Sequence, residues 1–202
     1  MICNCPNTEP LATIPTEACD FNLEQIQKMG VQKRGNAFDA EAAVPTDITL
    51  KADWDTMIAA EDDTKIVITP FVRNLIIEPG EFITTGGGDN STLNGVQEME
   101  GKNPSLVTGQ FKSLTPAQEK ALKQLECSDV DIFFFNGEGR IIAQATGTKK
   151  SGFKAEAFGI KDRRNAGFGT KDTFDFQFSL KPGWSEDLVK EVPTDFNPLY
   201  DL

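Results

Sequence analysis

The chain has 202 residues, which is enough for one domain with an ordinary hydrophobic core. Its 20 basic and 31 acidic residues give a formal net charge of −11. This charge argues against a protein that coats nucleic-acid phosphates, because such proteins bind through clustered Lys and Arg. No stretch reaches the roughly 20 apolar residues of a membrane span, and the N-terminus lacks the basic-then-apolar layout of a signal peptide. We expect a globular protein made in a cytosol.

The composition also restricts the chemistry, because the chain contains no histidine. Histidine is the commonest general base, the usual activator of Ser and Cys, and the commonest metal ligand. The carboxylate pairs Asp53/Asp55 and Asp129/Asp131 are typical of solvated faces in an acidic protein. We therefore predict no enzymatic activity and no cofactor.

The four cysteines are expected to be reduced thiols in a cytosol. The tight spacing of the first two does not match the two-residue spacer usual in zinc sites, and one ligand would come a hundred residues later. We predict no metal. The cysteines are Cys3, Cys5, Cys19 and Cys127.

The first third of the chain is irregular. Residues 1–20 hold three prolines and no sustained period, which predicts an extended N-terminal arm. Residues 21–34 fit neither helical nor alternating spacing well, and we predict a strand in their second half. A loop at 35–47 and a short acidic helix at 52–60 follow.

Residues 65–71 and 73–79 are rich in β-branched and aliphatic side chains and end at prolines, which predicts two neighbouring strands. Residues 81–102 contain five glycines and are too polar to supply core, so we predict a long exposed loop. Strand alternation returns at 105–113. Thr115, Pro116 and Gln118 then form a capping-box pattern, which predicts a helix to about Glu126.

The C-terminal half is antiparallel in pattern. Residues 129–136 and 140–147 flank a Gly-Glu-Gly turn and predict a hairpin whose first strand is central, because it is apolar on both faces. Strands are also predicted at 152–160 and 173–181. The last alternates without a break, which places its apolar residues on one face. The fold class is therefore mainly β, an antiparallel β-sandwich or barrel with one flanking helix.

We predict that the domain spans residues 21–183 and that residues 184–202 form a C-terminal arm. Residues 182–202 carry three prolines and follow the last predicted strand. The aromatic side chains of the arm are expected to anchor it at inter-subunit contacts. They are Trp184, Phe196 and Tyr200.

A glycine run in the predicted loop resembles a phosphate-binding loop only superficially. It lacks the Gly-Lys-Ser/Thr of a P-loop and the GxGxxG of a dinucleotide site, and the further oxygen ligands of a calcium loop are missing. We predict an exposed tip that contacts another subunit. The run is Gly86, Gly87, Gly88, Asp89 and Asn90.

Charge is unevenly distributed along the chain. The first sixty residues and the last twenty are acidic, whereas eight basic residues gather between 140 and 171. One interpretation is a chance cluster on exposed turns. The other is head-to-tail self-association of a basic face with the acidic face of the next copy, with Arg163 and Arg164 at the contact. The eight are Arg140, Lys149, Lys150, Lys154, Lys161, Arg163, Arg164 and Lys171.

The order of these features resembles the major tail-tube proteins of long-tailed bacteriophages. The stretches TPFVRNLIIEPGEFITTGGGDNSTLNGV and TKDTFDFQFSLKPGWS look like structural proteins from phages of Bacteroides-type hosts. The resemblance implies a β-sandwich that forms hexameric rings, stacked through arms and a long loop around a channel. DNA would pass through without specific binding, and the partners would be the protein itself and other virion proteins.

Two other functions fit the residues. A capsid decoration or head–tail connector protein would share the β fold and the absence of catalytic residues. A carbohydrate-binding or small-ligand-binding β-sandwich would use Trp54, Trp184 or Tyr200 to stack on a sugar.

Overall fold

The structure is a computed structural model that describes residues 21–88 and 91–202. The predicted N-terminal arm, residues 1–20, lies outside the described residues, as do Asp89 and Asn90. The described chain divides into two compact units. The first contains Gly80–Asn103 and the second, here called the main domain, contains Leu23–Pro79 and Pro104–Leu202. Within the described ranges no helix is both long and apolar enough to cross a membrane.

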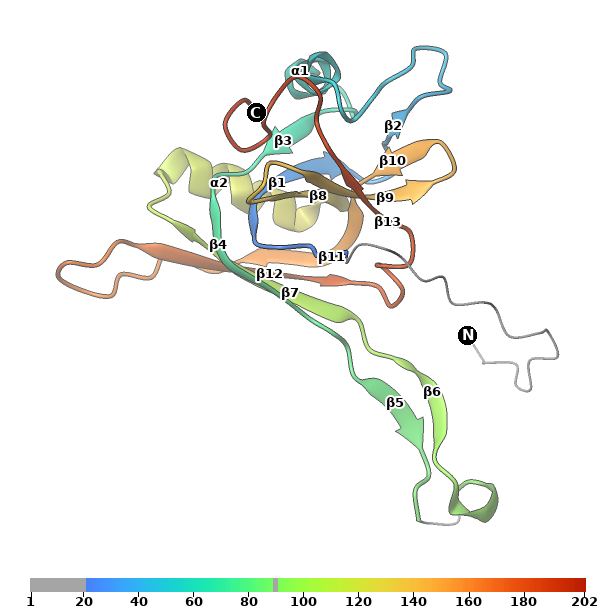
Figure 1. Cartoon of the computed structure of the whole chain (residues 1–202). Helices are drawn as coiled ribbons and strands as arrows, with labels where there is room; N and C mark the ends of the chain where they lie inside the picture. Colours follow the sequence, from blue (N-terminus) through green and yellow to red (C-terminus); the bar gives the residue numbers. More distant parts are fainter. Residues whose placement is uncertain (1–20, 89–90) are drawn as a thin grey trace. The chain divides into compact units, whose positions relative to one another are not determined.

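The main domain is built on one antiparallel sheet of eleven strands, so the mainly β prediction is confirmed (Figure 1). The central path runs β2-β10-β9-β8-β11-β12-β7-β4, with β1 on β8, β3 on β1 and β13 on β9. Its strands are β1 (Ile26–Lys33), β2 (Phe38–Asp39), β3 (Ile66–Ile68), β4 (Val72–Glu78), β7 (Ser105–Lys112), β8 (Val130–Asn136), β9 (Ile141–Thr146), β10 (Lys149–Ser151), β11 (Phe153–Ile160), β12 (Thr173–Leu180) and β13 (Leu188–Glu191). Its helices are α1 (Lys51–Ala59), α2 (Pro116–Gln124) and the 3-10 turn η2 (Leu125–Cys127).

Strand β8 organises the main domain because all seven of its residues are buried. Strand β1 pairs along one of its edges, while β11 and β9 share the other edge. Successive side chains of a strand point to opposite faces. The two faces of β8 therefore contribute to two separate hydrophobic cores, as expected for a central strand.

The first core contains Ile132 and Phe134 of β8 and the inner faces of β7, β11 and β12. The alternation predicted for 173–181 is confirmed, since Phe174, Phe176 and Phe178 of β12 are all buried there. Helix α2 begins at the predicted capping box and packs Leu122 against this core.

The second core lies on the other face of β8, under α1. Trp54 of α1 makes edge-to-face contacts with Phe133 and Phe135, at centroid distances of 5.4 Å and 5.5 Å. Phe38 packs beside Trp54, whose indole nitrogen donates a hydrogen bond to the Ile48 carbonyl. Such rings bury large apolar areas, and the indole N–H keeps a partner.

Two predictions about the chain path are corrected. Strands β3 and β4 are consecutive but do not pair with each other; β3 pairs with β1 and β4 with β7. The C-terminal residues, predicted as an extended arm, instead pack on the main domain: β13 pairs with β9, and Leu199 is buried in the second core. The short strands β2 and β10 were not predicted.

The other unit is a two-stranded antiparallel hairpin. It consists of β5 (Phe82–Thr85), the 3-10 turn η1 (Leu93–Gly95) and β6 (Glu98–Lys102). The register pairs Phe82 with Lys102 and Thr85 with Glu98, with an irregularity between Ile83 and Thr84. The segment predicted as a loop at 81–102 thus carries regular backbone pairing.

Candidate functional site

The predicted glycine run lies at the end of the hairpin. Gly86, Gly87 and Gly88 all have positive φ angles, which other residues adopt only with strain. The Gly88 amide donates to the Gly95 carbonyl at 3.2 Å, and the Thr92 hydroxyl donates to the Val96 carbonyl at 2.5 Å. The connection between β5 and β6 therefore has internal hydrogen bonds in its described part.

The hairpin also exposes apolar side chains that sequence reasoning missed, because it treated residues 81–102 as polar. Phe82 is 59% exposed and Leu93 is 81% exposed. No described residue of β5, η1 or β6 is buried. The sequence could have indicated this apolar surface, because the apolar pair Phe82-Ile83 precedes the turn and a second group of apolar residues follows it. The exposed apolar set is Phe82, Ile83, Leu93, Val96 and Met99.

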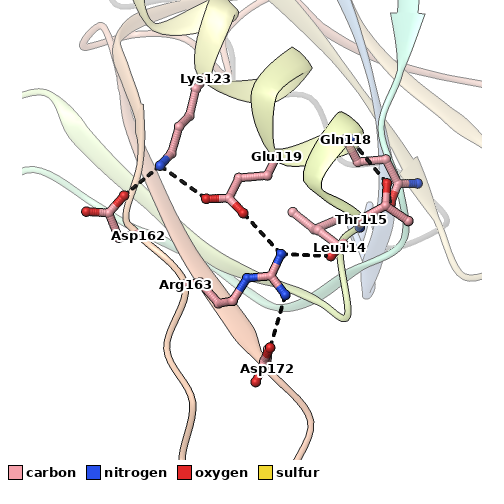
Figure 2. Close-up of polar contacts among 8 residues, drawn as sticks. All are labelled: Leu114, Thr115, Gln118, Glu119, Lys123, Asp162, Arg163 and Asp172. Atoms are coloured by element: carbon pink, nitrogen blue, oxygen red, sulfur yellow. Dashed lines mark hydrogen bonds and ion pairs between the residues drawn. The ribbon is translucent and has the colours of Figure 1, made fainter.

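Arg163 is held within its own chain. Its guanidinium donates to Glu119 at 3.1 Å, to Asp172 at 3.1 Å and to the Leu114 carbonyl at 3.2 Å (Figure 2). It also lies 4.9 Å from the centroid of the Phe174 ring. These contacts join α2 to the connection between β11 and β12. The guanidinium proposed for an inter-subunit contact is therefore already used inside the molecule.

Glu119 is shared with a second cation. Lys123 contacts Glu119 at 3.2 Å and Asp162 at 2.5 Å (Figure 2). Hydrogen bonds from Arg163 and then Lys123 lower the pKa of Glu119, and the bond from Lys123 lowers the pKa of Asp162. Hydrogen bonds to Asp162 and then Glu119 raise the pKa of Lys123, and hydrogen bonds to Asp172 and then Glu119 raise the pKa of Arg163. These side chains thus form one continuous ion-pair network between α2 and the connection of β11 to β12.

The structure divides the predicted basic set. Four members form ion pairs with carboxylates of the same chain: Arg140 with Glu138, Lys149 with Asp39, Lys150 with Glu191, and Arg163 as described. Among the described residues, no carboxylate lies within ion-pair distance of Lys161, Arg164 or Lys171. These three belong to residues 161–172, here called the basic loop, which joins β11 to β12.

The three predicted C-terminal aromatics do not form one surface. Trp184 is half-buried against Phe153 and donates to the Ser105 hydroxyl at 3.2 Å. Phe196 is half-buried beside the second core, whereas Tyr200 is exposed. Trp54, proposed for sugar stacking, is fully buried. Of the three stacking candidates only Tyr200 presents its ring to solvent.

Asp131 corrects the prediction of a solvated Asp129/Asp131 pair. The Asp131 side chain is 3% exposed and lies 3.6 Å from the Arg34 guanidinium, whereas the Asp129 side chain is 80% exposed. Burial raises the pKa of Asp131, against the hydrogen bond from the Gly35 amide and the charge of Arg34. Arg34 also contacts Glu156, so the Asp131 carboxylate belongs to a cluster of charged side chains around Arg34.

A cavity of about 520 Å³ lies between α2 and the segment that joins β3 to β4. Among the described residues that line it, Lys28 has the one charged side chain, and its ammonium donates to the Leu199 carbonyl and to the main-chain oxygen of Leu202. Burial lowers the pKa of Lys28. The other lining residues are Val67, Ile68, Thr69, Pro70, Phe71, Gln118, Ala121, Leu122, Leu125 and Leu202. In the described part of the chain no three Cys, Asp or Glu side chains are grouped to hold a metal.

The fold therefore defines a mainly antiparallel β protein whose notable surfaces are an apolar hairpin and a basic loop. No family model matches the chain, and no curated protein matches it. Among solved structures, one similar chain comes from the tail of an empty GTA particle with C6 symmetry. The alignment has 9% identity and a TM-score of 0.34, and covers 61% of this chain and 82% of the other. A TM-score of this size lies below the level of a shared fold.

Proposed function

We propose that this chain is a non-enzymatic virion structural protein that assembles into stacked rings and forms a tail tube for DNA passage. The observation that carries the proposal is the hairpin β5–β6, which exposes five large apolar side chains and has no buried residue in its described part. A two-stranded hairpin is at best marginally stable in water by itself. Several large apolar side chains exposed on one short element are typical of protein contact sites.

A second copy of the chain is the partner that fits a tube. In the proposed assembly the hairpin of one ring packs on the next ring, so that Phe82, Ile83 and Met99 leave water. The formal charge of −11 suits a bore that DNA must traverse without binding, because acidic walls repel the phosphate backbone. Sequence resemblance to tail-tube proteins supports the same function.

The test is negative-stain electron microscopy of the purified protein at rising concentration. Rings or hollow tubes are expected for the wild type. Deletion of residues 84–100 should leave a folded main domain that does not stack, since both hydrophobic cores lie outside these residues. Tubes formed normally by the deletion variant would refute the role of the hairpin.

A double variant tests the role of the apolar side chains without shortening the hairpin. Phe82→Ser combined with Met99→Ser should also abolish stacking, because both side chains are exposed and their loss leaves the cores intact. Val67→Ser combined with Ile76→Ser is the matched control, since it removes exposed apolar surface elsewhere and should leave assembly unchanged. Wild-type protein that stays monomeric at high concentration would favour a decoration or connector protein.

A further inference from the structure

The basic loop carries the most exposed large apolar side chain of the described residues. Phe168 is fully exposed, and all residues from 161 to 171 are exposed with it. Exposure of a phenylalanine ring to water has an unfavourable free energy. A single aromatic side chain at a protruding position is a common anchor in protein interfaces. Phe168 has no role in either core.

The loop holds Phe168 in a defined turn. The Arg164 amide donates to the Thr173 carbonyl at 2.9 Å, and the Thr173 amide donates back at 3.0 Å. Nearer the end, the Gly167 amide donates to the Asn165 side chain at 3.0 Å, and the Thr170 hydroxyl donates to the Gly167 carbonyl at 2.8 Å. An anchor that is ordered before binding loses less conformational entropy when it binds.

The charge around Phe168 is positive. The two carboxylates of the loop are already paired, Asp162 with Lys123 and Asp172 with Arg163. Lys161, Arg164 and Lys171 have no ion-pair partner among the described residues. The loop therefore presents an exposed aromatic ring together with three cations, and it fits an acidic surface with an apolar centre.

A surface of that kind occurs on the same chain, at the N-terminal end of α1. The Thr194 amide donates to the Thr49 carbonyl at 3.0 Å, and Asp195 accepts from the Lys51 amide at 2.9 Å. These bonds bring the segment after β13 beside the start of the helix. Leu50 and Val192 are exposed there among three aspartates. We call this surface the acidic patch: Asp47, Leu50, Asp53, Val192 and Asp195.

We propose that the basic loop of one copy docks on the acidic patch of a second copy, with Phe168 packed against Leu50 and Val192. The proposal rests on the proposed self-assembly and names the contact within it. The two surfaces lie at separate places of the main domain, the loop beyond β11 and β12 and the patch at α1 (Figure 1). A contact between two different surfaces is heterologous, so it repeats from copy to copy and closes a ring or extends a filament.

An acidic lipid surface is the other partner that an aromatic ring among cations can bind. The net charge of −11 opposes approach to anionic lipid, whereas the acidic patch supplies a complementary surface on a second copy. The second copy is therefore favoured.

Site-specific photo-crosslinking tests the contact directly. The full chain carries the photoreactive amino acid p-benzoylphenylalanine in place of Phe168 and is mixed with isotope-labelled wild type before illumination. Mass spectrometry should identify crosslinks between copies that end within residues 44–55 or 190–197. Crosslinks between copies that end elsewhere, or none at concentrations where the protein associates, overturn the proposal. So does crosslinking only to added vesicles of anionic phospholipid.

Charge reversal gives a second, independent measurement. Arg164→Glu combined with Lys171→Glu in the photoreactive chain should lower the crosslink yield about tenfold, as for loss of charged residues around an interface anchor. Lys65→Glu combined with Lys154→Glu is the matched control, because these exposed lysines make the same net change and lie outside both the basic loop and α2. An equal loss in the control overturns the contact.

The proposed contact and the proposed tube function can be refuted independently of each other. Tubes in the microscope without crosslinks to the acidic patch refute this contact and leave the proposed function standing. Crosslinks to the acidic patch without tubes at any concentration support the contact and refute the tube.

Discussion

Strand β8 and the hairpin β5–β6 are both rich in apolar side chains, yet the molecule treats them in opposite ways. Every residue of β8 is buried, because α1 covers one face and the strands of the first core cover the other. No described residue of the hairpin is buried, although Phe82 and Ile83 are as apolar as the residues of β8. The same kind of side chain thus stabilises the fold in one region and stays exposed in the other, where we propose that it mediates assembly.

The largest expected effect is on the free energy of unfolding, when a buried phenylalanine of β8 and an exposed phenylalanine of the hairpin are each replaced by alanine. Phe133→Ala removes a fully buried ring that touches Trp54 and Phe38, and should lower the free energy of unfolding by about 3–5 kcal/mol. Phe82→Ala should change it by less than about 0.5 kcal/mol, since the ring is mostly exposed. Urea unfolding of dilute protein, followed by far-UV circular dichroism, measures both values. Equal losses would contradict the division between core and assembly surface.

A second pair of variants tests backbone packing by adding a single methyl group. A Cβ at Gly152 would lie 2.6 Å from the Ile132 nitrogen and 2.8 Å from the Asp131 carbonyl carbon of β8. Because backbone atoms cannot yield as a flexible side chain can, Gly152→Ala should cost about 2–3 kcal/mol. A Cβ at Gly101 of the hairpin meets nothing within 4 Å, so Gly101→Ala should cost less than about 0.5 kcal/mol.

Thermal unfolding of the same two variants checks this pair. The Gly152→Ala protein should unfold at a lower temperature than wild type, and the Gly101→Ala protein at the same temperature. A tolerated methyl group at position 152 would mean that β11 and β8 can separate locally, and β8 would then no longer be the rigid centre of the sheet.

Local patterns in the sequence predicted the elements that depend on local physics. The alternation of 173–181 gives β12, the apolar run 129–136 gives the central strand β8, and Thr115 with Gln118 gives a capping box at α2. Each of these follows from residues a few positions apart. The mainly antiparallel fold could therefore be predicted.

Partner choice between distant segments could not be predicted in the same way. Strands β3 and β4 follow each other but pair with β1 and β7, since no residue within them specifies a partner. The four residues of β13 are all half-buried and show no alternation, so the sequence pattern predicts an arm and not a strand. Asp131 is buried because Arg34, almost a hundred positions earlier, lies beside it.

The candidate surfaces were predicted in part. The glycine run was predicted to be an exposed tip, and Gly86, Gly87 and Gly88 have positive φ angles between β5 and β6. The apolar side chains of the hairpin were missed because its glycines and acids dominate the composition. Arg163 was assigned to a contact between subunits, although Glu119 and Asp172 already hold its guanidinium. Phe168 was missed because two neighbouring glycines give it no periodic pattern, and only the structure shows that its ring is exposed.

The smallest expected effect is on the pH dependence of stability. It concerns Glu119, on the polar surface of the main domain, which belongs to neither β8 nor the hairpin. Hydrogen bonds from Arg163 and Lys123 keep the pKa of Glu119 below its ordinary value. The unfolded chain therefore binds this proton more tightly, with a pKa of about 4.3. The stabilising contribution of Glu119 is complete above that pH and is lost as the pH falls through the folded pKa.

Replacing Glu119 by Gln should remove this contribution. Both tryptophans lie in the main domain, so their fluorescence during urea unfolding reports on that domain alone. Between about pH 5 and pH 3 the urea midpoint of wild type should fall more steeply than that of Glu119→Gln, since 4.3 lies in this range. At pH 7 the variant should be only slightly less stable, because exposed ion pairs contribute little. Parallel acid profiles for the two proteins would show that the Arg163 network is positioned by the two cores and adds nothing to them.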